Sequence, residues 1–183
     1  MFDLLPFNAG DDILPAYRGT PIERLLRAHN LGEPGPAASR PELFIATCID
    51  NRETLAFPPG FAFVLRTAGV RLHGNEFELA YAVAVGGVSA VALIAHTDCG
   101  MAHVRDRRDE FVRGLVARGG VGADEAGAHF DAHLAAYALG DPVATVVEEA
   151  EEVRAWLPRL LVAPLLYRIE DGRLAQVAEP SAA

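Results

Sequence analysis

Two uninterrupted apolar runs constrain the fold of this chain more than any other feature. Residues 43–49 read L-F-I-A-T-C-I and residues 90–95 read A-V-A-L-I-A, and polar residues follow each run directly. Continuous apolar runs of this length are typical of strands that are buried on both faces, as they are in parallel sheets. The chain is therefore expected to contain a sheet that helices cover.

Other segments extend this pattern. Further strands are expected at residues 61–67, 162–169 and 174–177, the last two joined by a turn at D-G. Helices are expected at residues 21–30, 76–85, 101–118, 123–139 and 142–156. Strands that alternate with helices predict an α/β fold with a central, mainly parallel sheet flanked by helices.

The domain organisation follows from length and from the N-terminal composition. A chain of 183 residues is close to the size of one ordinary domain. Residues 1–40 are interrupted by proline and glycine and contain one short helical segment, so they cannot build a core by themselves. We expect an N-terminal helical arm over residues 1–40 and one α/β domain over residues 41–183.

The charge of the chain excludes some classes of partner. A formal net charge of −9 does not supply the basic surface that nucleic-acid binding needs. The one basic run, at residues 105–113, is interleaved with acids and is typical of a solvated helix face. No apolar stretch is long enough for a membrane helix, and the N-terminus lacks the basic region of a secretion signal. A cytoplasmic location is expected, where the two cysteines would stay reduced.

The two cysteines both lie next to expected strand ends. Cys48 closes the first apolar run, and His96 and Cys99 follow the second. Because the carboxyl ends of parallel strands meet at one edge of a sheet, these side chains are expected to converge, with Asp50 and Arg52 beside them. Thiolate and imidazole are ligands that zinc prefers, and three protein ligands leave a fourth position open, as in catalytic zinc sites.

Two other interpretations of these residues stay open. A buried free cysteine is often only a small apolar side chain. A cysteine nucleophile assisted by His and Asp is also conceivable, but it leaves the second cysteine without a role.

The motifs resemble the signature of the β-class carbonic anhydrases, Cys-x-Asp-x-Arg followed further along the chain by His-x-x-Cys. Here they read C-I-D-N-R at residues 48–52 and H-T-D-C-G at residues 96–100. The segment F-V-L-R-T-A-G at residues 63–69 and the closing P-L-L-Y-R-I-E-D-G-R-L at residues 164–174 are also similar to that family. The resemblance spans residues 43–177 and is strongest to the small bacterial branch.

The resemblance implies a mechanism and a set of roles. Cys48, His96 and Cys99 would hold a zinc ion, and a zinc-bound hydroxide oriented by the Asp50–Arg52 dyad would hydrate carbon dioxide reversibly to bicarbonate and a proton. In the family this aspartate can also bind the metal and close the site. Hydrolysis of carbonyl sulfide or carbon disulfide at the same zinc is one alternative. A catalytically silent zinc protein, acting as a bicarbonate sensor or an assembly partner, is the other.

The sequence departs from the family around the substrate. It lacks the glutamine that the family usually carries in its N-terminal segment, because its single glutamine is Gln176. Backbone amides of Ala68, Gly69 and Gly100 are expected to supply polar contacts instead. Arg66 is interpreted either as lining an anion pocket or as a structural arginine at a strand end.

Three histidines and the apolar N-terminal residues complete the expectations. His103 is either a proton relay from the site or a surface residue, and His129 and His133 are interpreted as a polar helix surface rather than a second metal site. The family resemblance implies a homodimer or an assembly of dimers. The arm is expected to pack in that dimer, since its apolar residues need to be covered: Phe2, Leu4, Leu5, Phe7 and Ile13.

Overall fold

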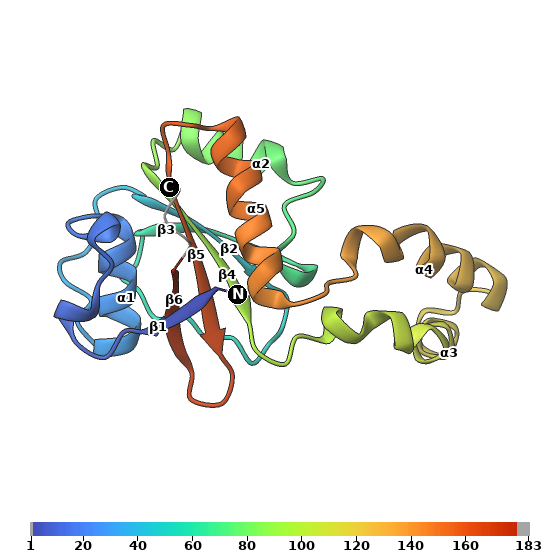
Figure 1. Cartoon of the computed structure of the whole chain (residues 1–183). Coiled ribbons are helices and arrows are strands. Elements are labelled where there is room, and N and C mark those ends of the chain that lie inside the picture. The colour runs from blue at the N-terminus through green and yellow to red at the C-terminus, as the bar shows by residue number, and fades with distance from the viewer. Residues whose placement is uncertain (1, 179–183) are drawn as a thin grey trace.

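The computed structural model describes residues 2–178 and contains a six-stranded sheet in the order β1-β6-β5-β4-β2-β3 (Figure 1). The strands are β1 (Asp3–Pro6), β2 (Leu43–Cys48), β3 (Ala62–Thr67), β4 (Ala90–His96), β5 (Leu161–Arg168) and β6 (Arg173–Ala178). The neighbours β3, β2, β4 and β5 run parallel, whereas β6 pairs antiparallel with β5 and β1 antiparallel with β6. The predicted α/β fold with a mainly parallel sheet is confirmed.

Five α-helices connect these strands: α1 (Pro21–Leu31), α2 (Glu76–Ala84), α3 (Arg108–Gly119), α4 (Ala123–Tyr137) and α5 (Pro142–Trp156). Local sequence explains where two of them begin. Thr20 and Asp141 are N-caps whose side chains accept backbone hydrogen bonds from Ile22 and Ala144, and a proline follows each cap.

The expected helix at residues 101–118 begins later than predicted. Gly100–Arg107 form a 3-10 segment, and the α-helix starts only at Arg108. The backbone amides of Met101 and Ala102 bond to the Cys99 side chain, and the Ala102 amide also donates to the Cys99 carbonyl at 3.0 Å. These bonds favour the tighter winding of the segment that follows Cys99.

The two faces of the sheet are covered by different parts of the chain. Helix α1 packs on one face, where Leu25 and Leu26 belong to the same buried cluster as Ile45, and helices α2 and α5 cover the other. The N-terminal arm contributes to this core, because Phe7 is 0% exposed and belongs to the same cluster. Phe7 is therefore covered by its own chain, whereas Leu4 of the arm stays 43% exposed.

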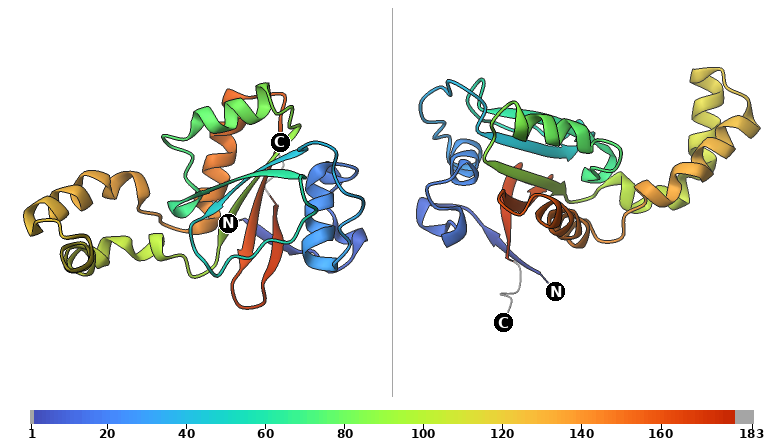
Figure 2. Two further views of the ribbon diagram at one scale, coloured as in Figure 1. Left: turned by 180° about the vertical axis from the view of Figure 1, so that it is seen from behind. Right: turned by 90° about the horizontal axis from the view of Figure 1, so that it is seen from above.

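Helices α3 and α4 form a hairpin that reaches away from the sheet (Figures 1 and 2). Within the described residues α3 buries none of its side chains, and α4 buries only Ala126, Gly127 and Phe130. None of the helices in residues 2–178 combines the length and apolar character that crossing a membrane requires.

Candidate metal centre

Three predicted ligands converge at the carboxyl edge of the sheet. Cys48 is the last residue of β2, His96 is the last residue of β4, and Cys99 follows in the next turn. Because β2 and β4 are parallel neighbours, their ends meet, and the ligand atoms of the three side chains all lie within 4.8 Å of one another. All three residues are buried.

The spacing of these atoms fits a tetrahedral metal ion. The Sγ atoms of Cys48 and Cys99 are 4.0 Å apart. Two sulfurs bound tetrahedrally to one zinc ion, at about 2.3 Å each, would be separated by about 3.8 Å. The two cysteines are free thiols rather than a disulfide. The geometry is therefore that of a soft-ligand cation site.

The His96 ring is oriented for metal binding. Its Nδ1 lies 2.8 Å from the Thr97 carbonyl oxygen, to which it donates a hydrogen bond. Its Nε2 is buried and has no hydrogen-bond partner among the described residues. A hydrogen bond that fixes one ring nitrogen leaves the lone pair of the other available to a metal. The buried Nε2 is thus explained if a cation binds it.

The two thiols differ in their acidity. A hydrogen bond with the Cys99 thiol lowers the pKa of Cys48 to about 4, and backbone amides of Gly69 and Asp50 act in the same direction. The hydrogen bond with Cys48 and burial raise the pKa of Cys99. The two sulfurs therefore share a proton between them, which a bound metal ion would displace.

Asp50 and Arg52 form an ion pair at the mouth of this centre. Arg52 donates from Nη2 to Asp50 Oδ2 at 2.7 Å and from Nε to Oδ1 at 3.0 Å. These bonds lower the pKa of Asp50 to about 2. Asp50 Oδ2 lies 3.9 Å from His96 Nε2. The carboxylate is therefore ionised and next to the position where the three ligands converge.

Arg66 is bonded to the loop that carries this pair. Its Nη1 donates to the carbonyl oxygen of Cys48 at 2.8 Å and to that of Asp50 at 3.3 Å, and its Nη2 donates to that of Glu53 at 2.9 Å. These contacts are those of the structural arginine considered from the sequence. They hold the loop after β2 against the end of β3.

The other predicted pocket residues occupy different places. Gly69 is buried with a φ of 70°, and a Cβ there would lie 2.8 Å from Leu139 Cδ1, so the chain needs glycine at this position. Its amide bonds to the Cys48 sulfur rather than lining an open pocket. Ala68 is half-buried, whereas Gly100 and His103 are exposed.

Glu53 is a residue of the centre that sequence reasoning missed. It is 2% exposed, and its Oε1 lies 3.7 Å from His96 Nε2. Burial raises the pKa of Glu53 to about 7. Its position directly after C-I-D-N-R was the only available signal, and a carboxylate in a polar loop is ordinarily exposed.

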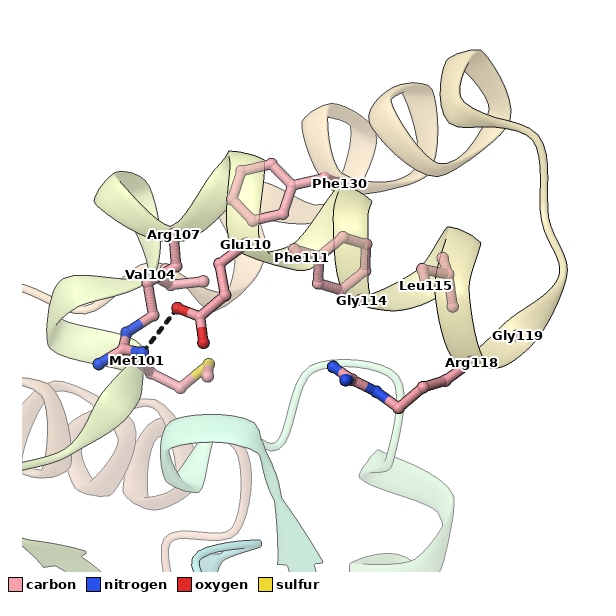
Figure 3. Close-up of a pocket in the computed structure, with 10 residues that line it drawn as sticks. All are labelled: Met101, Val104, Arg107, Glu110, Phe111, Gly114, Leu115, Arg118, Gly119 and Phe130. Carbon is pink, nitrogen blue, oxygen red and sulfur yellow. Dashed lines mark hydrogen bonds and ion pairs between the residues drawn. The ribbon is translucent and has the colours of Figure 1, made fainter.

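Two largely apolar cavities lie beside the 3-10 segment that follows Cys99, and none of the residues that line them is a candidate metal ligand. A cavity of about 580 Å³ lies between the 3-10 segment and the helices α3 and α4 (Figure 3). A second cavity of about 460 Å³ shares part of this wall and extends to Ala68. Met101 lines both and packs against Cys48, Cys99 and Leu139. The residues common to both cavities are Met101, Val104, Phe111 and Phe130.

Comparison with known proteins identifies the family. The sequence pattern of the carbonic anhydrase family matches residues 43–174. This span includes both motifs of the centre and covers most of the chain. The chain therefore belongs to the β-carbonic anhydrase family. No curated protein matches the sequence significantly.

Solved structures share the fold. The β-carbonic anhydrase isoform I of Trichomonas vaginalis has a TM-score of 0.62 at 18% identity, over 78% of this chain and 86% of that chain. A carbonic anhydrase of Streptococcus mutans has a TM-score of 0.58 at 23% identity, over 78% and 87%. A carbon disulfide hydrolase has a TM-score of 0.55 at 18% identity, over 80% and 82%. At these identities the likeness establishes the fold alone.

Proposed function

We propose that this chain is a zinc-dependent enzyme that hydrates carbon dioxide reversibly to bicarbonate and a proton. The observation that carries the proposal is the convergence of Cys48, His96 and Cys99 within 4.8 Å, beside an ionised Asp50. Zinc, when bound to such ligands, lowers the pKa of a water molecule and so supplies a nucleophile near neutral pH. Membership of the family supports the same reaction.

The Asp50–Arg52 dyad is proposed to orient that nucleophile. An ionised carboxylate can only accept hydrogen bonds, so Asp50 would accept one from the attacking oxygen. This bond would orient that oxygen so that one of its lone pairs points toward the carbon atom of the substrate. Arg52 keeps Asp50 ionised and in place through its two parallel bonds. Arg52 is itself steadied by Asp98, whose Oδ2 lies 2.8 Å from Nη1.

Met101 packs against Cys48 and Cys99 and also lines two largely apolar cavities, which favour a small, weakly polar substrate. Their shared wall of Met101, Val104, Phe111 and Phe130 offers few hydrogen bonds to a charged molecule. Carbon dioxide, carbonyl sulfide and carbon disulfide all suit such a wall. The fold shared with a carbon disulfide hydrolase keeps the last of these as a second candidate.

Turnover of the three gases by the purified zinc-loaded protein tests the assignment. We expect carbon dioxide to be consumed fastest. Faster turnover of either sulfur compound would assign the chain to the second candidate. Absence of turnover for all three, with zinc bound, would leave a silent zinc protein that acts as a sensor or assembly partner.

We also propose that the chain forms a homodimer through α2 and the open edge of β3. Phe77, Tyr81 and Val85 repeat every four residues along α2 and its end and are 77%, 51% and 68% exposed. Val64 on β3 is 46% exposed, and β3 is the last strand of the sheet. An apolar stripe beside an unpaired strand edge suits a second copy of the same surface. We further propose a cytoplasmic location, where a reducing environment would keep Cys48 and Cys99 from forming a disulfide.

A further inference from the structure

The buried carboxylate of Glu53 has no part in the function proposed so far. Its side chain is 0% exposed, and its Oε2 accepts a hydrogen bond from the Thr47 hydroxyl. Its Oε1 is buried and has no hydrogen-bond partner among the residues that the structure describes. A buried polar atom left in this state is costly, so it calls for an explanation such as an ion.

The backbone fixes where this carboxylate lies. The Glu53 amide donates to the Asp50 carbonyl oxygen at 3.2 Å, and the Glu53 carbonyl accepts from Arg66 Nη2 at 2.9 Å. Thr47 lies in β2, one residue before the ligand Cys48. The main chain of Glu53 and one of its carboxylate oxygens are therefore held by hydrogen bonds. These bonds also fix the position of the other oxygen, Oε1.

The unpartnered oxygen faces an unpartnered nitrogen. Glu53 Oε1 lies 3.7 Å from His96 Nε2, which is too long for a hydrogen bond. A cation held at Cys48, His96 and Cys99 would bind His96 Nε2 and would lie near Glu53 Oε1, so the negative carboxylate would attract it without being one of its ligands.

Glu53 differs from Asp50 in its contacts with the neighbouring arginine side chains. Both Asp50 oxygens accept hydrogen bonds from Arg52. Arg66, the other arginine nearby, directs its guanidinium at backbone carbonyls instead of at the Glu53 carboxylate. Glu53 Oε1 is thus the carboxylate oxygen of the centre that is free to act on a metal ion.

We propose that Glu53 is not a ligand but a neighbouring anionic group, whose free carboxylate oxygen strengthens the binding of a divalent cation at Cys48, His96 and Cys99. The inference rests on the proposed function, since it concerns the same ion. It divides the work between two carboxylates. Glu53 attracts the cation from the buried side and leaves the fourth position open, and Asp50 remains paired with Arg52 at the mouth.

Zinc affinity tests this proposal without reference to turnover. Competition with a chelator is measured for the wild-type protein, Glu53→Gln and the control Glu149→Gln. Glu149 is also buried, but it bonds to Arg71 Nη1 at 2.8 Å and to the Leu72 amide, away from the centre. We expect Glu53→Gln to bind zinc about 10- to 100-fold more weakly and the control to match the wild type. Equal or tighter zinc binding by Glu53→Gln would overturn the proposal.

A second variant keeps the test valid if Glu53→Gln fails to fold. Glu53→Leu fills a similar volume without any oxygen, and the circular dichroism of each metal-free variant reports whether it is folded. Whichever folded variant is used, weakened zinc binding supports the proposal and unchanged binding overturns it. A wild-type protein that binds no zinc would overturn both this inference and the proposed function. Zinc binding and carbon dioxide hydration by the wild type, with unchanged affinity in the variants, would overturn this inference alone.

Discussion

Arg52 binds both carboxylate oxygens of Asp50, with Nη2 2.7 Å from Oδ2 and Nε 3.0 Å from Oδ1. The Arg52 amide also donates to Oδ1 at 2.9 Å. The Asp50 carboxylate is therefore fixed in direction as well as in charge, two residues after the ligand Cys48. A carboxylate fixed in this way can accept a hydrogen bond from a group at the candidate metal site without a change in its own orientation.

Replacing Asp50 by asparagine removes the negative charge and exchanges one acceptor oxygen for an N–H donor, while it keeps the shape of the side chain. We expect carbon dioxide hydration, followed by stopped flow, to fall by about 100-fold or more. Zinc content should be unchanged. Asp98→Asn is the matched control, because Asp98 contacts the same arginine from an exposed position, and it should change the rate by less than about fivefold. A wild-type rate in Asp50→Asn would contradict the role proposed for the dyad.

Arg66 provides a prediction about stability. Arg66→Met removes three hydrogen bonds to backbone carbonyls of the loop after β2, so the free energy of unfolding should fall by about 2 kcal/mol. Urea denaturation of the metal-free protein measures this change, with Arg113→Met on the exposed face of α3 as control. Unaltered stability combined with lost bicarbonate binding would instead favour the anion-pocket interpretation of Arg66.

The dimer surface can be tested against the N-terminal arm. The double change Phe77→Asp and Tyr81→Glu places charge in the exposed stripe of α2, and sedimentation velocity should then show a monomer. Leu4→Asp is the comparison, because Leu4 is the arm residue that stays 43% exposed. Dissociation by Leu4→Asp with an intact dimer in the α2 variant would place the interface on the arm.

His29 predicts how stability depends on pH. Its Nδ1 accepts a hydrogen bond from the Ala56 amide at 3.1 Å, and its Nε2 donates to the Gly172 carbonyl at 2.8 Å. Burial lowers the pKa of His29 below the ordinary value for histidine, about 6.5. As the pH falls below about 6.5, the unfolded chain takes up this proton before the folded one does, so stability is lost.

The measurement is the Tm at several pH values between about 7.5 and 5.5, for the wild type and for His29→Gln. The wild-type Tm should fall over this interval, and the fall should be smaller in the variant because one titrating group is gone. An equal fall in the two proteins would show that His29 does not contribute to the pH dependence.

Much of the fold could be predicted because the signals are local. The strands Leu43–Cys48 and Ala90–His96 are buried on both faces, so their apolar runs are continuous and their ends place the candidate metal ligands. The four-residue strand Asp3–Pro6 escaped prediction, because it forms only by pairing with Arg173–Ala178 at the far end of the chain. Such an edge strand has no local pattern of its own.

The candidate site could likewise be predicted only where the signal is local. Cys48, His96 and Cys99 could be predicted from their residue types and from the rule that parallel strand ends meet. Glu53 could not, since its burial depends on Thr47 and on the fold of the loop that Arg66 holds. The burial of the Phe7 side chain likewise depends on how the arm packs against the sheet of its own chain, and no local sequence pattern specifies this packing.

The central claim is that three side chains from two neighbouring strand ends hold one zinc ion. Elemental analysis of the protein purified without added metal tests this claim most directly. We expect one zinc ion per chain in the wild type and almost none in Cys48→Ser, because a hydroxyl does not replace a thiolate ligand. A wild-type protein without zinc, or a Cys48→Ser variant that keeps the full amount, would contradict the account.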